Sequence, residues 1–522
     1  MRPLSLPALP VLLASFFLSA CVSQPVIPED TSYQTTATAI PIEEHWQEQP
    51  ANADFDDVWP RLLDNFGLQL ELDNPRLKEQ RDWFVKHPTY MERVTQRAEP
   101  YIYYIAEQIE ARQMPGEVAL LPIVESAFDP FAYSHGRASG VWQFIPSTGK
   151  YFGLQQDWWY DGRRDIRAAT NAALDYLSNL ANQFDGDWQL ALASYNSGAG
   201  TVRRAIRRNQ QAGKPTDFWS LDLPQETQAY VPKLLALAQL LKYPEKYNIP
   251  FSPVSNTPFF SVVDTGGQID LAQVAEMSDT DLEAIYRLNP GFNRWATRPD
   301  GPHQVLVPVD KRQELQLALA DLPPSKRLQW HRYTVKSGDN LQLISRTYRT
   351  TPDVIKEANN LHNSTIRVGQ ILLIPAALKN QEAYSQSLSQ RLDRTRAQRQ
   401  PGNTSKVSYS VHPGDTFWEI GRKYGVTARD IAHWNGMAPG DPLSVGQKLT
   451  VWVPQGKNTA ARSAREEIRK VTYSVRSGDS LASIAGRFRV SIADIRKWNP
   501  NDTRNKYLYP GQKLLLHVNV VR

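Results

Sequence analysis

One acidic side chain stands at the end of an apolar run. The stretch ALLPIVESAFDPFAYS covers residues 119–134, and Glu125 directly follows the apolar segment Leu120–Val124. Burial disfavours the charged form of a carboxylate and raises its pKa. Either the segment is an ordinary helix end whose last residue reaches water, or a protonated carboxyl is needed at this place. A protonated carboxyl in an apolar seat is suited to general acid catalysis.

Further residues that could bind or position a substrate follow Glu125 along the chain. They are Ser126 and Ser134 in the same stretch, Gln143 in ASGVWQFIPSTG, Tyr195 and Asn196 in ASYNSG, and Tyr230 in ETQAYVPKLLA. Each also has an ordinary structural interpretation. Ser134 would then be a plain loop residue. Gln143 and Asn196 would cap loops, and Tyr195 and Tyr230 would be core aromatics.

Four aspartates in this region are candidates for a second catalytic carboxylate: Asp129, Asp157, Asp161 and Asp165. Aspartates in such loops are mostly solvated or cap helices, and we expect Asp165 to cap the helix that follows it. No His/Cys cluster indicates a metal, no Gly-rich loop indicates a phosphate site, and no motif supports a Ser/His/Asp triad. We therefore expect neither metal nor cofactor.

The elements that must position these residues are helices. The stretch DIRAATNAALDYLSNLANQF has one apolar face, made of Ile166, Ala169, Ala173, Leu177, Leu180 and Phe184. Pro224 and an acidic first turn open the helix that carries Tyr230. Gly198 stops the helix that carries Tyr195. No clear alternating strand pattern occurs between residues 54 and 250, which predicts one all-α domain there.

The C-terminal half contains three repeats. In each, a Tyr is followed at fixed offsets by a Gly-Asp pair, an Asn and a Gly-Gln pair before a short apolar strand. The Gly-Asp pairs are Gly338-Asp339, Gly414-Asp415 and Gly478-Asp479. The pattern predicts strand–helix–helix–strand units over 331–376, 407–455 and 471–518. Polar, Arg-rich linkers separate them, and we expect these to be flexible or loosely helical.

A fourth, degenerate unit is predicted over 258–310. Leu271, Val274, Ile285 and Asn289 fall on positions that the three repeats share, but Gln268-Ile269 replace the Gly-Asp pair. The alternative is a connector that matches by chance. We expect the apolar positions to pack as a small core beside the helical domain and the unit to add little ligand binding.

The N-terminus resembles a bacterial lipoprotein signal. Cys21 is the sole cysteine, so no internal disulfide can form. The preceding apolar stretch PVLLASFFLSAC is too short to span a bilayer and is typical of a signal-peptide core. Residues 18–21 resemble a lipobox, which implies a signal peptide over 1–20, a lipid on Cys21 and a polar tether over 21–53. Val22 implies retention in the outer membrane, facing the periplasm; a plain secretory signal is the alternative.

The order Glu-Ser, Gly-x-x-Gln, Tyr-Asn and a later Tyr resembles the lysozyme-like lytic transglycosylases, and the repeats resemble LysM modules. The resemblance implies a multidomain protein in which an all-α lysozyme-like catalytic domain is followed by small α+β (βααβ) modules. Trp142 and Ser194 depart from the family, which often has Met and Ala there.

The implied reaction is non-hydrolytic cleavage of the MurNAc-β-1,4-GlcNAc bond of peptidoglycan, giving 1,6-anhydromuramoyl ends. Glu125 would act first as acid and then as base, while the other motif residues bind substrate. The Gly-Asp pairs would lie in glycan-binding grooves. A goose-type lysozyme-like hydrolase and a catalytically dead glycan-binding scaffold are the alternatives. The net charge of +5 is too weak to indicate nucleic acid.

Overall fold

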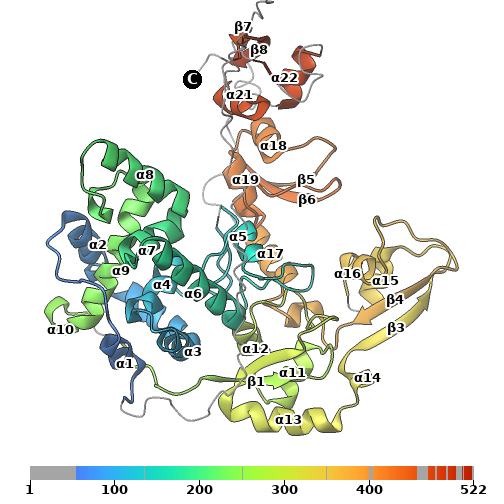
Figure 1. Ribbon diagram of the computed structural model, residues 1–522. Coiled ribbons are helices and arrows are strands. Elements are labelled where there is room, and N and C mark those ends of the chain that lie inside the picture. The colour runs from blue at the N-terminus through green and yellow to red at the C-terminus, as the bar shows by residue number, and fades with distance from the viewer. Residues whose placement is uncertain are drawn as a thin grey trace, which may run out of the picture. The chain divides into compact units, whose positions relative to one another are not determined.

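The structure is a computed structural model (Figure 1). It describes residues 55–134, 136–249, 251–348, 350–398, 404–454, 468–475, 479–488, 492–500, 508–509 and 511–519. The predicted signal and tether with Cys21, and also Gly478, lie outside these residues. None of the helices in the described part of the chain has both the length and the apolar character that a membrane span requires.

The N-terminal region is built from helices, as predicted. They are α1 (Val58–Asp64), α2 (Pro75–Val85), α3 (Pro88–Ala111), α4 (Leu121–Ser126), α5 (Pro146–Tyr151), α6 (Ile166–Gln183), α7 (Trp188–Ser197), α8 (Ala199–Gln211), α9 (Gln225–Lys242) and α10 (Pro244–Tyr247), with 3₁₀ turns η1 (Gly116–Leu120) and η2 (Phe218–Ser220). This confirms the all-α character expected from the periodicity.

Local sequence explains the two helices that frame the site. The Asp165 side chain accepts a hydrogen bond from Ala168 N at 2.8 Å and caps α6, as predicted. The six apolar residues of the predicted α6 face are each at most 8% exposed. Helix α9 begins after Pro224, is buried along most of its length, and contacts α2, α4 and α7. Helix α9 therefore crosses the core beside the helix that carries Glu125.

The degenerate unit has the βααβ order of the repeats. Strand β1 (Phe260–Asp264) pairs antiparallel with β2 (Gln304–Pro308), and α11 (Leu271–Met277) and α12 (Leu282–Leu288) lie between them in sequence. Leu271, Val274 and Ile285 are fully buried in one cluster with Trp159 of the helical region, which confirms the predicted packing. The unit continues through η3 (Val309–Lys311), α13 (Arg312–Asp321) and α14 (Pro324–Arg327).

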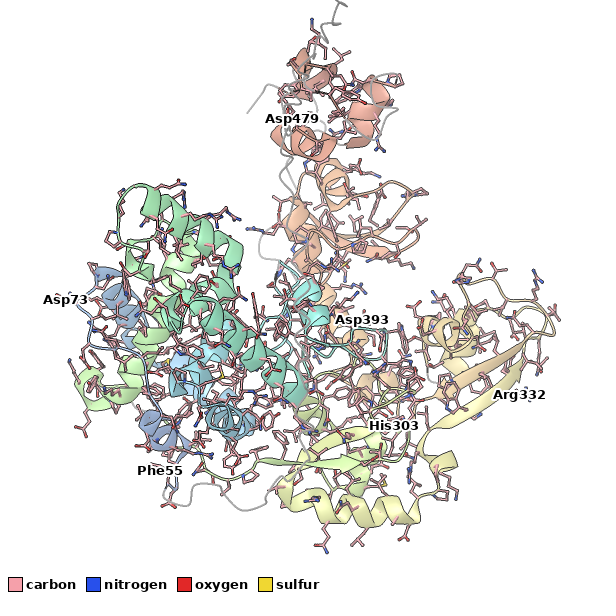
Figure 2. The ribbon with its side chains drawn as sticks, viewed as in Figure 1. Phe55, Asp73, His303, Arg332, Asp393 and Asp479 are labelled. Carbon is pink, nitrogen blue, oxygen red and sulfur yellow. The ribbon has the colours of Figure 1, made fainter. Side chains whose placement is uncertain are left out.

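The three repeats each form a two-stranded antiparallel sheet with two helices, as predicted. Their elements are β3 (Gln329–Thr334), α15 (Leu341–Thr347), α16 (Pro352–Ala358) and β4 (Ile371–Ala376); β5 (Thr404–Ser410), α18 (Phe417–Tyr424), α19 (Ala428–Trp434) and β6 (Lys448–Pro454); β7 (Ile468–Ser474), α21 (Leu481–Phe488), α22 (Ile492–Trp498) and β8 (Lys513–Asn519). Figure 2 labels Arg332 in the first repeat and Asp479 in the third.

The shared Asn explains why these units hold together. Asn435 is fully buried, and its Nδ2 donates to Ile431 O and to Thr450 O, each at 2.8 Å. Its Oδ1 accepts from Thr450 N at 2.8 Å, so one side chain joins α19 to β6. Asn289 makes the same three bonds in the degenerate unit. The repeated Asn is therefore a structural residue.

The linker after the first repeat contains a helix, which agrees with the helical alternative of the expectation, but a buried residue also anchors it. It forms η4 (Gln381–Ala383) and α17 (Leu388–Ala397). Tyr384 is 2% exposed, and its hydroxyl donates to the Asp270 carboxylate at 2.8 and 3.0 Å. A buried aromatic residue with a buried partner fixes this segment in spite of its polar composition. The predicted second linker lies mostly outside the described residues.

Candidate active site

Glu125 lies in the last turn of α4, the short helix that follows η1. The helix ends because Ala127 adopts a left-handed conformation with φ of 51°, and Phe128 follows with φ of 52°. Non-glycine residues in this region carry a cost of about 1–2 kcal/mol each. Phe128 is fully buried, and this burial offsets the cost of the turn. The chain thus turns sharply after the acid and returns to the core at Phe128.

The Glu125 carboxylate is paired with the Tyr230 hydroxyl of α9, which donates to Oε1 at 2.5 Å. Tyr230 is 5% exposed, whereas Glu125 retains partial exposure. Burial raises the pKa of Glu125 to about 7, the Tyr230 bond opposes this rise, and the nearby charge of Glu226 adds to it. A pKa of about 7 leaves a large fraction of this carboxyl protonated near neutral pH, in the direction that its apolar neighbours predict, and its role as an acid stays a prediction.

Helix α7 brings Tyr195 and Asn196 to the same region. The Tyr195 hydroxyl donates to Trp142 O at 2.8 Å, and burial followed by the Glu125 charge raises the pKa of this phenol well above its usual value. Asn196 Oδ1 accepts from Thr227 Oγ1 at 2.7 Å, which leaves the amide NH₂ of Asn196 to other partners. Sequence reasoning missed Thr227. Its position three residues before Tyr230, on the same face of α9, was the available signal.

Gln143 lies in a tight loop that is held against the 163–164 segment. Its φ is 49°, and its Nε2 donates to Gly140 O at 2.8 Å. Gly140 has φ of 80°, and a Cβ there would lie 2.1 Å from Arg163 O, so only glycine fits. Trp142, the departure from the family pattern, is fully buried, and its indole donates to Thr170 Oγ1 at 2.9 Å. The unusual tryptophan is therefore a core residue.

The two serines of the motif make bonds to backbone. The Ser126 hydroxyl lies within donating distance of two carbonyl oxygens, Val141 O at 3.0 Å and Pro122 O at 3.2 Å. Ser134 Oγ accepts from Ala138 N at 3.0 Å and closes a turn. Both hydroxyls thus help to hold the segment 134–141 that leads to Gln143, and contact of either with a substrate stays a prediction.

The four aspartate candidates for a second acid are engaged elsewhere. Asp161 is ion-paired with Arg163 at 2.8 Å and Arg164 at 3.0 Å; burial opposes ionisation, but the two guanidinium groups lower its pKa. Asp165 caps α6, Asp157 accepts from backbone N–H groups of residues 159 and 160, and Asp129 accepts from the N–H of residue 131. The carboxylate whose charge acts on Glu125 is instead Glu226.

The Gly-Asp pairs of the repeats build their turns. Asp339 Oδ2 accepts from the Tyr333 hydroxyl at 2.6 Å and from Lys336 N at 2.7 Å. Asp415 makes the equivalent bonds, and Asp479 accepts from Tyr473 at 2.5 Å. Gly338 and Gly414 have φ of 87° and 88°, conformations that favour glycine. The pair therefore connects the first strand of a unit to its first helix.

Family comparisons agree with this division of the chain. Residues 103–218 match the Transglycosylase SLT domain, and residues 259–323 match the LysM-like domain of lytic transglycosylase MltD. Residues 333–375, 409–452 and 473–516 each match the LysM domain. The degenerate unit is thus a LysM-like domain. A helical SLT domain followed by these units defines a lytic transglycosylase with LysM glycan-binding repeats.

Comparison with curated relatives identifies the family within this class of enzymes. The chain is 35% identical over 514 residues to membrane-bound lytic murein transglycosylase D of Escherichia coli K12, and the match covers 97% of each chain. The protein therefore belongs to the membrane-bound lytic murein transglycosylase D family. It is also 31% identical over 189 residues to an autolysin of Enterococcus faecalis, covering 35% of this chain and 24% of the autolysin.

A solved structure is also similar in sequence. An inactive mutant of the lytic transglycosylase Slt from Pseudomonas aeruginosa is 25% identical, covering 29% of this chain and 25% of the other, with a TM-score of 0.21.

Proposed function

We propose that Glu125 is the catalytic acid and base of this transglycosylase and that the enzyme cleaves the MurNAc-β-1,4-GlcNAc bond without water. The observation that carries the proposal is the partly exposed carboxyl with a pKa of about 7, held at 2.5 Å by Tyr230. A group that must both give and take a proton works best when its pKa is near the working pH.

In the first step the protonated Glu125 gives its proton to the glycosidic oxygen, and the bond from that oxygen to C1 of MurNAc breaks. The charge at C1 is oxocarbenium-like, and the substrate's own N-acetyl group supports it. In the second step ionised Glu125 takes the proton of the C6 hydroxyl while O6 bonds to C1. The products are a 1,6-anhydromuramoyl end and a free GlcNAc end, and Glu125 regains its proton.

The neighbouring residues have binding roles in this scheme. Tyr230 donates to the ionised form of Glu125 between the two steps. Asn196, whose Oδ1 is occupied by Thr227, has amide donors for sugar oxygens. Gln143, whose Nε2 donates to Gly140 O, has a free Oε1 acceptor for an amide or hydroxyl. Ser126, Ser134 and Tyr195 hold the surrounding loops and are the remaining candidates for substrate contact.

Product analysis of Glu125→Gln and wild type on purified murein sacculi tests the proposal. The Gln side chain is nearly isosteric but cannot act as acid or base, and loss of a general acid lowers the rate by about 10²–10⁴-fold. Wild-type products should carry anhydro ends and no oxygen from isotopically labelled water. Near-normal cleavage by the Gln variant contradicts the role of Glu125. Reducing ends that carry the labelled oxygen contradict a reaction in which water takes no part.

Hydrolysis of the goose-type lysozyme kind is the second candidate, because the charge of Glu226 acts on Glu125. Glu226 lies exposed in the first turn of α9. If Glu226 activates a water, Glu226→Gln should abolish cleavage and the wild-type products should contain labelled oxygen. If the charge of Glu226 only shifts the pKa of Glu125, Glu226→Gln should still cleave the glycan and release products with anhydro ends. A dead scaffold is contradicted by any Glu125-dependent cleavage.

The modules have separate tasks in this proposal. Residues 54–250 cleave, the 258–310 unit supports them, and 331–376, 407–455 and 471–518 bind glycan at grooves whose edges are the Gly-Asp turns. Several weak sites on one chain raise the overall avidity for a polymer. A chain that ends at Gln398, after the folded linker, should still cleave soluble glycan fragments but bind sacculi several-fold more weakly. Unchanged sacculus binding contradicts a targeting role of the last two modules.

The proposed location is the periplasmic face of the outer membrane, through a lipid on Cys21. The support is the lipobox-like sequence and the membrane-bound family to which the chain belongs. Cys21→Ser should move the protein from the membrane to the soluble fraction and abolish labelling by a fatty acid. An unlabelled wild type contradicts lipidation.

A further inference from the structure

A groove with arginine side chains lies between α8 and the segment that precedes α9. Arg204, Arg207 and Arg208 of α8 form one wall, and Asp222, Leu223 and Pro224 form the other. The groove encloses a volume of about 620 Å³. Spacings of three and four residues place the three guanidinium groups on one helix face. We call this feature the arginine groove.

The arginine groove has an excess of positive charge. Its three arginines face one carboxylate, that of Asp222, so its lining carries a net charge of +2. Arg208 pairs with Asp222 at 3.5 Å, but the two side chains are 60% and 84% exposed, and such surface pairs are weak. Arg204 donates to Thr201 Oγ1 at 3.1 Å, a neutral partner. The lining thus retains guanidinium groups for an anionic ligand.

The arginine groove lies close to the active site along two helices. Helix α8 begins three residues after Asn196, and Pro224 is the N-cap of α9. On α9, Thr227 bonds to Asn196 and Tyr230 bonds to Glu125. At 1.5 Å per residue, these two lie only about 5 and 9 Å along the helix axis from Pro224. A ligand attached to a sugar in the active site needs only a short arm to reach the Pro224 edge of the arginine groove.

We propose that the arginine groove binds the carboxylates of the peptide stem that the muramoyl sugar of murein carries. The proposal rests on the murein-cleaving function above. A stem of four residues spans roughly 13–14 Å when extended, which is more than the distances of about 5 and 9 Å along α9 and is therefore long enough to enter the groove. Guanidinium groups bind carboxylates in a bidentate manner, and Leu223, only 5% exposed, is an apolar floor for small aliphatic side chains.

An anionic membrane surface is the competing occupant. A flat bilayer is contacted best by cations that project from a convex face. Here the cations line a hollow that also holds the Asp222 carboxylate. The shape and the mixed charge favour a small ligand with several carboxylates and amide groups.

Cleavage kinetics on two matched soluble substrates test the proposal: murein strands with their peptides, and the same strands after an amidase has removed the peptides. In the full-length enzyme, Arg204→Ala/Arg207→Ala should raise KM about tenfold for peptide-bearing strands, the effect of losing charge-assisted bonds. The kcat, and KM for bare strands, should stay unchanged. Arg203→Ala is the matched control, because Arg203 on the same helix bonds to Gln183 and packs over Phe184 instead.

An equal change of KM on both substrates, or none on either, overturns the proposal. Calorimetric binding of the free peptide stem to the Glu125→Gln enzyme tests the arginine groove independently of cleavage. Salt and Arg207→Glu should both weaken this binding, and its absence with all arginines intact overturns the proposal even if the enzyme cleaves murein as expected. If Arg207→Glu in a Cys21→Ser background weakens binding to anionic phospholipid vesicles but leaves stem binding unchanged, a membrane is the occupant and the proposal is wrong.

Discussion

The pairing of Glu125 with Tyr230 predicts how the pH dependence of the enzyme should respond to Tyr230→Phe. The hydroxyl donates to the carboxylate at 2.5 Å and lowers the pKa of Glu125, while burial raises that pKa to about 7. Removing the hydroxyl deletes a donor that stabilises the ionised form. The pKa of Glu125 should therefore rise further.

The size of the shift follows from the energy of one hydrogen bond. Bonds to charged groups contribute about 1.5–3 kcal/mol, and one pKa unit corresponds to about 1.4 kcal/mol. The pKa should thus rise by about 1–2 units. Because Glu125 must be protonated to act as the acid, the alkaline limb of kcat/KM against pH should move upward by the same amount.

The measurement is the pH–rate profile of both enzymes on soluble glycan strands across the neutral and alkaline range. Tyr176→Phe is the matched control. This substitution also removes a phenolic hydroxyl. The Tyr176 ring packs against Tyr195, with ring centroids 5.4 Å apart, and not directly against Glu125. An alkaline limb of Tyr230→Phe that moves to lower pH, or that coincides with that of Tyr176→Phe, would refute the assignment of Glu125 as a buried acid stabilised by Tyr230.

Three further predictions concern stability and binding. The Glu125 pKa of about 7, raised by burial from 4.5, means that the carboxyl contributes stability below pH 4.5 that is lost as pH rises to 7. Glu125→Gln should therefore have a free energy of unfolding about 3 kcal/mol higher than that of wild type above pH 7, and a similar one below pH 4.5, as thermal or urea unfolding would measure. Thr227→Val should free the Asn196 amide to rotate and raise KM for glycan several-fold with little change in kcat, and Thr227→Ser should restore it. Asn435→Ala leaves buried backbone groups of Thr450 unpaired, and hydrogen exchange in β5 and β6 should accelerate while β3 and β4 serve as the internal reference.

Much of the scaffold could be predicted because local patterns specify it. The apolar face of α6 follows from helical periodicity, and all six of its predicted residues are buried. The repeats follow from fixed offsets, and the offsets that survive in the degenerate unit include that of the Asn that joins helix to strand. The direction of the pKa shift of Glu125 could be predicted from its apolar neighbours, because burial is the largest cause of the shift.

Long-range partners could not be predicted in this way. The motif order placed Ser126 and Ser134 among the substrate contacts, but no local pattern shows that their hydroxyls bond to backbone in the structure. The same holds for the Asp of each Gly-Asp pair, whose repetition indicates importance without telling a ligand role from a fold role. Tyr384 lies in a polar segment without periodicity, and its partner Asp270 is 114 residues away.

The degenerate unit shows what a LysM-like fold can do without its Gly-Asp turn. Arg164 is buried, and its guanidinium donates to Pro290 O at 2.8 Å and to Asn293 Oδ1 at 2.6 Å, both in this unit. Its neighbour Arg163 donates to Phe144 O, in the loop that carries Gln143. A buried guanidinium without partners is costly, so the loop and the unit stabilise each other through Asp161 and these two arginines. The unit that lacks the Gly-Asp turn thus supports the loop on which substrate binding is proposed to depend.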